Sequence, residues 1–67
     1  MILFDERLKE LRLEKNLSQI QLAEKLGTSQ RSISSWETGE RRPDYEMLEK
    51  MTKFFDVTAD YLLGISE

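Results

Sequence analysis

The residues of this sequence that could do chemistry are hydrogen-bonding side chains in one short run, Gln30 to Ser35, which reads QRSISS. A glutamine amide offers a donor beside an acceptor, and an arginine guanidinium offers paired donors. The 67 residues include no cysteine and no histidine, which excludes disulfides, thiolate or imidazole metal ligands and Ser-His or Cys-His nucleophiles. We therefore expect recognition by hydrogen bonding, with no cofactor and no small-molecule ligand.

Five helices are expected to position this run, because apolar residues recur at helical spacing behind residues that cap helices well. Strand signals are missing, since no sustained alternation and no two-residue hairpin turn occurs. The sequence predicts a compact, all-α, five-helix domain that occupies residues 1–67. The expected helices run from about Asp5 to Lys15, from Gln19 to Gly27, from Ser29 to Gly39, from Asp44 past Phe55, and from Thr58 to about Gly64.

The second and third helices are expected to form a helix-turn-helix from Gln19 to Glu37. Ser18 and Gln21 have the spacing of a capping box, and the small Ala23 allows the two helices to approach closely. Gly27 can take the left-handed conformation of a sharp turn. Ile33 and Trp36 lie one turn apart, so they predict the inner face of the third helix.

The opposite face of the third helix follows from about 100° of rotation per residue. This geometry predicts that Arg31, Ser35 and Thr38 point outward, with Ser34 on the flank and Gln30 at the exposed N-terminal end. These are short polar side chains and one arginine, with no acid among them. Such a face suits entry into the major groove of DNA.

Charge permits a nucleic-acid partner without establishing one. The net charge is −3, but residues 15–43 carry five bases and three acids, whereas residues 44–67 carry two bases and six acids. No apolar run approaches the roughly 20 residues of a membrane span, and the N-terminus lacks the layout of a signal peptide. We expect a cytoplasmic protein without a membrane partner.

The ordered motifs LSQIQLAEKLG (17–27), ISSWETG (33–39), Pro43 and DYLLG (60–64) resemble the phage lambda repressor and Cro type of helix-turn-helix regulator, the xenobiotic-response-element family. The resemblance covers almost the whole chain. It implies sequence-specific binding of double-stranded DNA by a transcriptional regulator, most often a repressor. It departs from the family pattern at Asp56, where glycine is usual, and at Glu40, beside the expected phosphate contacts.

The resemblance assigns roles to individual positions. Gln19 is expected to contact a phosphate and to support Gln30, the first residue of the recognition helix. Base reading is assigned to Gln30 and Arg31, with Ser35 and Ser34 beside them, and Arg12 with Glu37 is expected to form a structural ion pair between the first and third helices. The residues expected to position the DNA backbone are Gln19, Asn16, Ser29, Thr38, Arg41 and Arg42.

A homodimer on a palindromic operator is expected, because one recognition helix reads few base pairs. The candidate dimer surface is C-terminal and comprises Tyr61, Leu62, Leu63 and Ile65. The chain either stands alone or forms the N-terminal part of a longer regulator.

Two other classes remain as alternatives. A protein-interaction module on the same fold would not need DNA-contacting side chains on its third helix. The combination of Gln19, Gln30, Arg31 and Arg42 therefore favours DNA binding. An enzyme is disfavoured, because the carboxylates are scattered and a core this small leaves little volume for a pocket.

Overall fold

The computed structural model describes residues 3–65, and every regular element in that range is a helix. The all-α, five-helix class is thus confirmed, and the first helix begins and ends one residue earlier than expected. No helix in this part of the chain could span a bilayer, since the longest have 11 residues against the roughly 20 required. The helices are α1 (Phe4–Glu14), α2 (Gln19–Leu26), α3 (Gln30–Thr38), α4 (Tyr45–Phe55) and α5 (Ala59–Leu63).

Four helices begin at the side-chain caps that the sequence predicts. Ser18, Ser29, Asp44 and Thr58 each accept a hydrogen bond from the backbone N–H three residues on, at 2.8 to 3.2 Å. The capping box at α2 is complete, because Ser18 N–H also donates to Gln21 Oε1 at 2.8 Å. These bonds satisfy N–H groups that have no partner within a helix, so local sequence fixes where α2 to α5 start.

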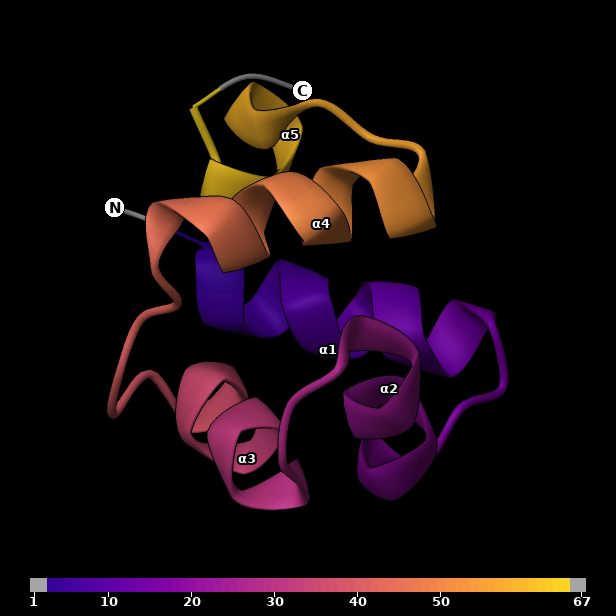
Figure 1. The fold of residues 1–67 in the computed structure, drawn as a ribbon. Helices are drawn as coiled ribbons and strands as arrows, with labels where there is room; N and C mark the ends of the chain where they lie inside the picture. The colour runs from indigo at the N-terminus through magenta and orange to yellow at the C-terminus, as the bar shows by residue number, and fades with distance from the viewer. Residues whose placement is uncertain (1–2, 66–67) are drawn as a thin grey trace.

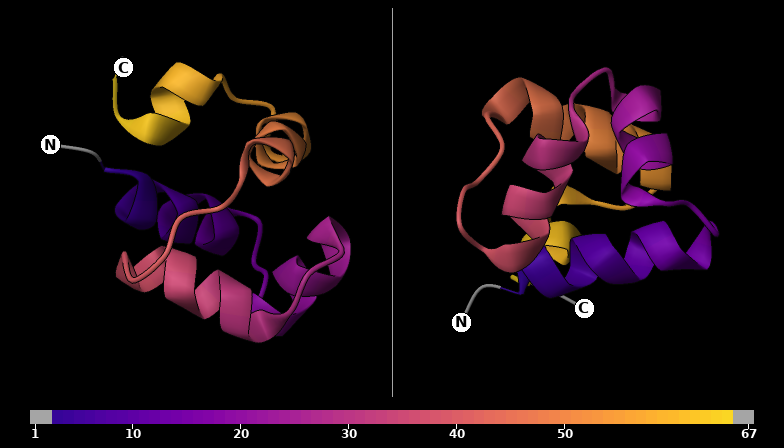
Figure 2. Two further views of the ribbon diagram at one scale, coloured as in Figure 1. Left: turned by 60° about the vertical axis from the view of Figure 1, so that its left-hand side comes forward. Right: turned by 90° about the horizontal axis from the view of Figure 1, so that it is seen from below.

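The helices form two pairs on either side of α1 (Figure 1). α2 and α3 lie together on one side of α1, and α4 and α5 lie on the other, as the two further views show (Figure 2). Helix α1 packs against α3 and α5, and α2 packs against α3 and α4. The fully buried side chains at the centre are Leu8, Leu22, Ile33, Met51 and Leu62, one from each helix.

The assignment of Leu62 to an exposed dimer surface is wrong. Its side chain is 0% exposed and belongs to the core. The reason is the short length of α5, which has five residues and contacts both α1 and α4, so its one central leucine must point inward.

Asp56 takes the left-handed conformation that the family usually gives to glycine. Its φ and ψ are 57° and 49°, and it ends α4 as the C-cap residue. Asn16, after α1, has the same φ of 57°. Aspartate and asparagine are the non-glycine residues that adopt this conformation most readily, so both turns form without glycine.

We expect Gly64→Ala to lower the free energy of unfolding by about 1 to 3 kcal/mol. Alanine would be strained in the left-handed backbone conformation, and its Cβ would clash with Leu3. Gly64 has a φ of 78°, and a Cβ there would lie 2.8 Å from the backbone nitrogen of Leu3. Urea denaturation would measure the loss. The matched control is Gly27→Ala, where φ is 73° but the nearest atom is 3.8 Å away. Equal losses in the two variants would contradict a role for the Leu3 contact.

Candidate nucleic-acid interface

The turn between α2 and α3 is built as the helix-turn-helix expectation requires. Gly27 is left-handed, with a φ of 73° and a ψ of 37°, and Thr28 N–H donates to the Ala23 carbonyl at 2.9 Å. Ala23 is 3% exposed, so its small side chain lies inside the packed α2–α3 pair. The turn holds α3 at a fixed angle to α2.

The inner and outer faces of α3 are mostly as predicted. Ile33 is fully buried and Trp36 is 8% exposed, so both belong to the core. Gln30, Arg31 and Thr38 are exposed, and Ser34 is half-buried on the flank. Arg31 forms no ion pair within residues 3–65, which leaves its guanidinium available to a ligand.

The predicted outward direction of Ser35 is wrong. The residue is 8% exposed, and its Oγ donates to Glu40 Oε1 at 3.3 Å. The chain after α3 folds back over this position, because the N–H groups of Glu40 and Arg41 both donate to the Ser35 carbonyl, at 3.0 and 3.3 Å. Ser35 therefore secures the loop that carries Arg41 and does not present its hydroxyl to solvent.

Gln19 and Gln30 are joined directly. Gln30 Nε2 donates to Gln19 Oε1 at 2.6 Å, across the turn and between the first residues of the two helices. Gln19 is thus placed to support the first residue of α3, as expected. With one N–H engaged, the Gln30 amide keeps its second N–H and its carbonyl oxygen for another partner.

The ion pair of Arg12 and Glu37 is confirmed and is nearly buried. Arg12 Nε and Nη2 donate to the two Glu37 oxygens at 2.6 and 3.1 Å, and the side chains are 9% and 4% exposed. Arg12 Nη1 also donates to the Leu17 carbonyl at 2.8 Å. The paired geometry and the extra carbonyl bond offset the cost of taking two charges out of water.

These two pairs form one continuous network, which the sequence pattern did not predict. Gln19 Nε2 donates to Glu37 Oε1 at 3.1 Å, so the order of contacts is Arg12, Glu37, Gln19 and Gln30. A signal for it exists in the sequence, because Gln30 and Glu37 are seven residues, or about two turns, apart on one face of α3. The network connects a buried charge to an exposed amide on the recognition helix.

The remaining backbone candidates lie at different places around the helix-turn-helix. Arg41 and Arg42 are exposed and line an open hollow of about 350 Å³ together with Trp36 and Ser32. Ser29 is exposed, but its Oγ is already occupied as the α3 cap and lies 3.1 Å from Ser32 Oγ. Asn16 is exposed in the turn after α1.

The rest of the candidate dimer surface is only partly open. Ile65 is 70% exposed, whereas Tyr61 and Leu63 are half-buried. The Arg7 guanidinium lies 4.2 Å from the centre of the Tyr61 ring and donates to the Tyr61 carbonyl. One face of that ring is therefore covered by α1 of the same chain.

The chain belongs to the helix-turn-helix family, whose model matches residues 8–62. This family is a DNA-binding class of transcriptional regulators and not a class of enzymes. The chain is 50% identical over 64 residues to the HTH-type transcriptional activator BcrR of Enterococcus faecalis, covering 96% of this chain and 31% of that protein. It is 41% identical to the regulator YqaE of Bacillus subtilis, covering 91% of this chain and 53% of that one. The chain thus spans a third to about half of these relatives.

Solved structures are similar over nearly the whole chain. A transcriptional regulator from Listeria innocua superposes with a TM-score of 0.91 at 31% identity, covering all of this chain and 63% of that one. The P22 c2 repressor, solved in complex with a synthetic operator, superposes with a TM-score of 0.87 at 32% identity. That match covers 94% of this chain and 96% of the repressor. The fold is therefore that of lambda-like repressor domains.

Proposed function

We propose that this domain binds double-stranded DNA sequence-specifically as part of a transcriptional regulator, with α3 in the major groove. The observation that carries the proposal is the Gln19–Gln30 hydrogen bond, backed by Glu37 and Arg12. An exposed glutamine would otherwise sample many rotamers and lose that freedom on binding. Holding the amide in place before DNA arrives lowers this cost, as pre-organisation generally does.

Base reading is assigned to the two exposed residues at the start of α3. The remaining N–H and carbonyl of Gln30 match adenine N7 and N6 in the major groove. The Arg31 guanidinium matches guanine O6 and N7. Ser34, on the flank, is within the same face, while buried Ser35 is left out of the proposal.

The backbone contacts and the assembly are also proposals. Arg41 and Arg42 would contact phosphates of one DNA strand. Further backbone contacts that position the helix-turn-helix without specifying sequence would come from Gln19, Asn16, Ser29 and Thr38. A homodimer on a palindromic operator would place two α3 helices about 34 Å apart. Exposed Ile65 and half-buried Leu63 and Tyr61 are the candidate contact. The complete regulator would be longer than this domain, in keeping with the length of its relatives. We place it in the cytoplasm, where a transcriptional regulator would meet its DNA.

Selection of bound duplexes from a random pool would test DNA recognition, and we expect a palindromic consensus. Gln30→Ala and Arg31→Ala should each lose about 1 to 3 kcal/mol on the best site and relax preference at one base pair. Arg42→Gln serves as the control for a backbone contact, since it should weaken all sequences alike and lower the salt slope by about 1. Sedimentation of the saturated complex should give two protomers per palindromic site. A single protomer per site would contradict the dimer.

Repression is the regulatory direction we propose, because a protein seated on an operator excludes others from the same DNA without any further contact. Activation is the second candidate, favoured by the 50% identity to a transcriptional activator. Transcription from a promoter carrying the selected site distinguishes the two. If no consensus emerged and the α3 variants bound like the unaltered domain, the fold would instead serve as a protein-interaction module.

A further inference from the structure

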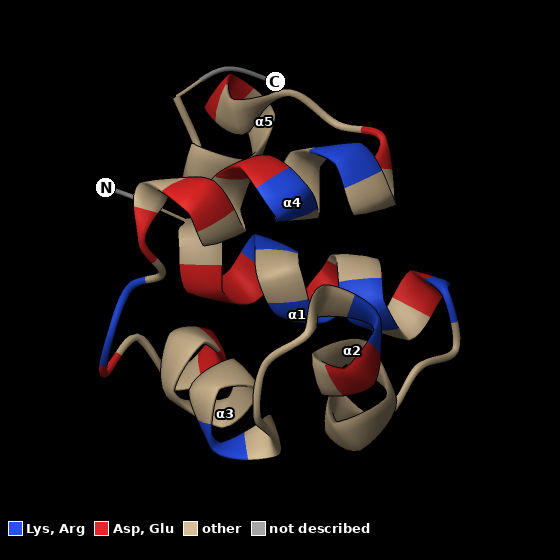
Figure 3. Ribbon diagram, in the orientation of Figure 1, with Lys and Arg blue, Asp and Glu red and all other residues tan. Residues whose placement is uncertain are grey.

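Four of the five lysines of this acidic protein gather around one aromatic side chain, Phe54. Lys15 follows α1 as its C-cap residue, Lys25 lies in the last turn of α2, and Lys50 and Lys53 lie on α4. Blue segments occur on α2 and at the right-hand ends of α1 and α4 in Figure 3. We name this surface the lysine face.

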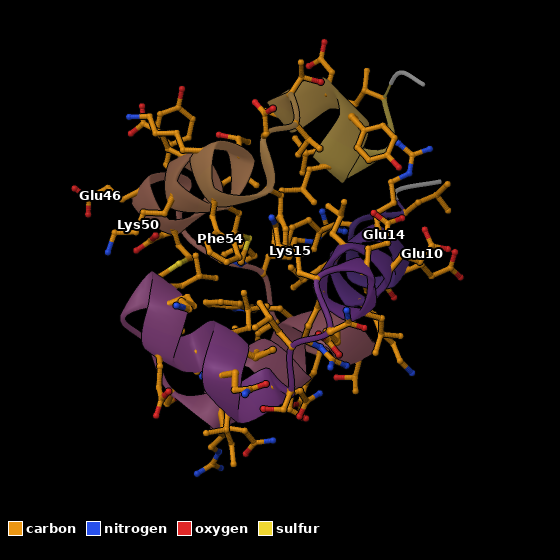
Figure 4. All side chains as sticks on the ribbon, turned by 90° about the vertical axis from the view of Figure 1, so that its right-hand side faces the viewer. Glu10, Glu14, Lys15, Glu46, Lys50 and Phe54 are labelled. Atoms are coloured by element: carbon orange, nitrogen blue, oxygen red, sulfur yellow. The ribbon has the colours of Figure 1, made fainter. Side chains whose placement is uncertain are left out.

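The lysine face surrounds a shallow hollow of about 390 Å³. Its lining includes Lys25, Lys50, Lys53 and Phe54, with Glu24 as the only acid among the lining residues. The fourth lysine, Lys15, lies beside the aromatic ring, with its Nζ 5.3 Å from the centre of the Phe54 ring. Figure 4 shows Phe54 between Lys15 and Lys50, with Glu14 and Glu46 farther out on either side.

The lysines of this face form no ion pair within the described chain, although Lys50 also borders a neighbouring hollow lined by Glu46 and Glu49. The sequence as a whole has 13 acids. Lys50 Nζ is held against the Leu26 carbonyl at 3.4 Å, at the C-terminal end of α2. Like charges placed together repel one another, and this costs stability unless an anionic partner is present.

The lysine face does not include the base-reading residues of α3, although Lys15 adjoins Asn16, one of the proposed backbone contacts. It lies at the C-terminal end of α2, whereas Gln19 contacts Gln30 at the N-terminal end, about 12 Å away along eight residues of helix. The Phe54 ring also makes an edge contact with Phe55, with 5.0 Å between ring centres, and Lys15 covers it from the other element. The part of the ring that these two contacts leave open lines the hollow as an apolar floor.

We propose that the lysine face docks an acidic segment of a partner protein, with carboxylates meeting the lysines and one apolar side chain resting on Phe54. The lysines favour a negatively charged partner through charge complementarity. The half-buried Phe54 ring favours an apolar side chain in the same partner segment. Because the face lies away from α3, this contact can form on the DNA-bound domain.

Fluorescence anisotropy with a labelled glutamate-rich peptide that carries one central leucine tests the proposal. Each of Lys25→Gln and Lys53→Gln should weaken binding about two- to fivefold, and the double variant by the product. Lys9→Gln is the matched control, since Lys9 is the one exposed lysine outside the face and should leave binding unchanged. A peptide with serine in place of leucine should also bind more weakly.

Two results would overturn the proposal. One is equal binding by the double variant, the Lys9→Gln control and the unaltered domain. The other is a loss of affinity for duplex DNA or oligothymidine in the double variant as large as its loss for the peptide, which would assign the face to nucleic acid. Both substitutions are exposed, so the fluorescence of Trp36 should report an unchanged fold.

Discussion

Replacing Arg12 by methionine is expected to lower the free energy of unfolding by about 3 to 5 kcal/mol. The Glu37 carboxylate that it leaves behind is 4% exposed and would be a buried charge without its cation. A domain of this size has a total stability of only roughly 3 to 10 kcal/mol, so much of the variant would be unfolded at 37 °C. Urea denaturation followed by Trp36 fluorescence, at low temperature and with a stabilising osmolyte, would measure the loss.

The double variant Arg12→Met, Glu37→Met shows whether the stability loss of Arg12→Met comes from the unpaired Glu37 charge or from lost packing of Arg12. Replacing both partners by apolar groups removes the buried charge, so the double variant should be more stable than Arg12→Met alone. Arg31→Met is the control for the same change at an exposed site and should stay within about 0.5 kcal/mol of the unaltered domain. If the double variant were the less stable of the two, a stranded carboxylate would not be the cause.

Ile33→Ala should cost about 2 to 5 kcal/mol, because Ile33 is fully buried under the recognition helix and its loss leaves a cavity. The same urea titration measures it. DNA affinity of the folded fraction should fall as well, since Ile33 fixes how far α3 projects from the core. Binding measured at 10 °C with an excess of folded protein separates this effect from unfolding.

Ile20→Ala is the matched control for Ile33→Ala. It makes the same chemical change one helix away, but Ile20 is 61% exposed. The expected change in stability is within about 0.5 kcal/mol of zero. Comparable losses in the two variants would mean that the inner face of α3 contributes no more to stability than the exposed surface of α2, and would contradict the packing of Ile33 in the core.

Much of this fold could be predicted because its signals are local. Each of the caps Ser18, Ser29, Asp44 and Thr58 satisfies N–H groups within its own helix, and Gly27 supplies its turn without help from distant residues. Helical spacing then places Ile33 inside and Arg31 outside. Backbone hydrogen bonding and side-chain period act over a few residues, so the sequence by itself determines them.

The tertiary structure alone decided the features that depend on distant residues meeting. Ser35 is buried because the Glu40–Arg41 loop returns over it, and Leu62 is buried because α5 lies against α1 and α4. The contact of Gln19 with Glu37 and the gathering of lysines at Phe54 join separate helices in the same way. Helix packing sets these neighbours, and a rotation of about half a turn, or a change in the path of a loop, moves a side chain from solvent to core.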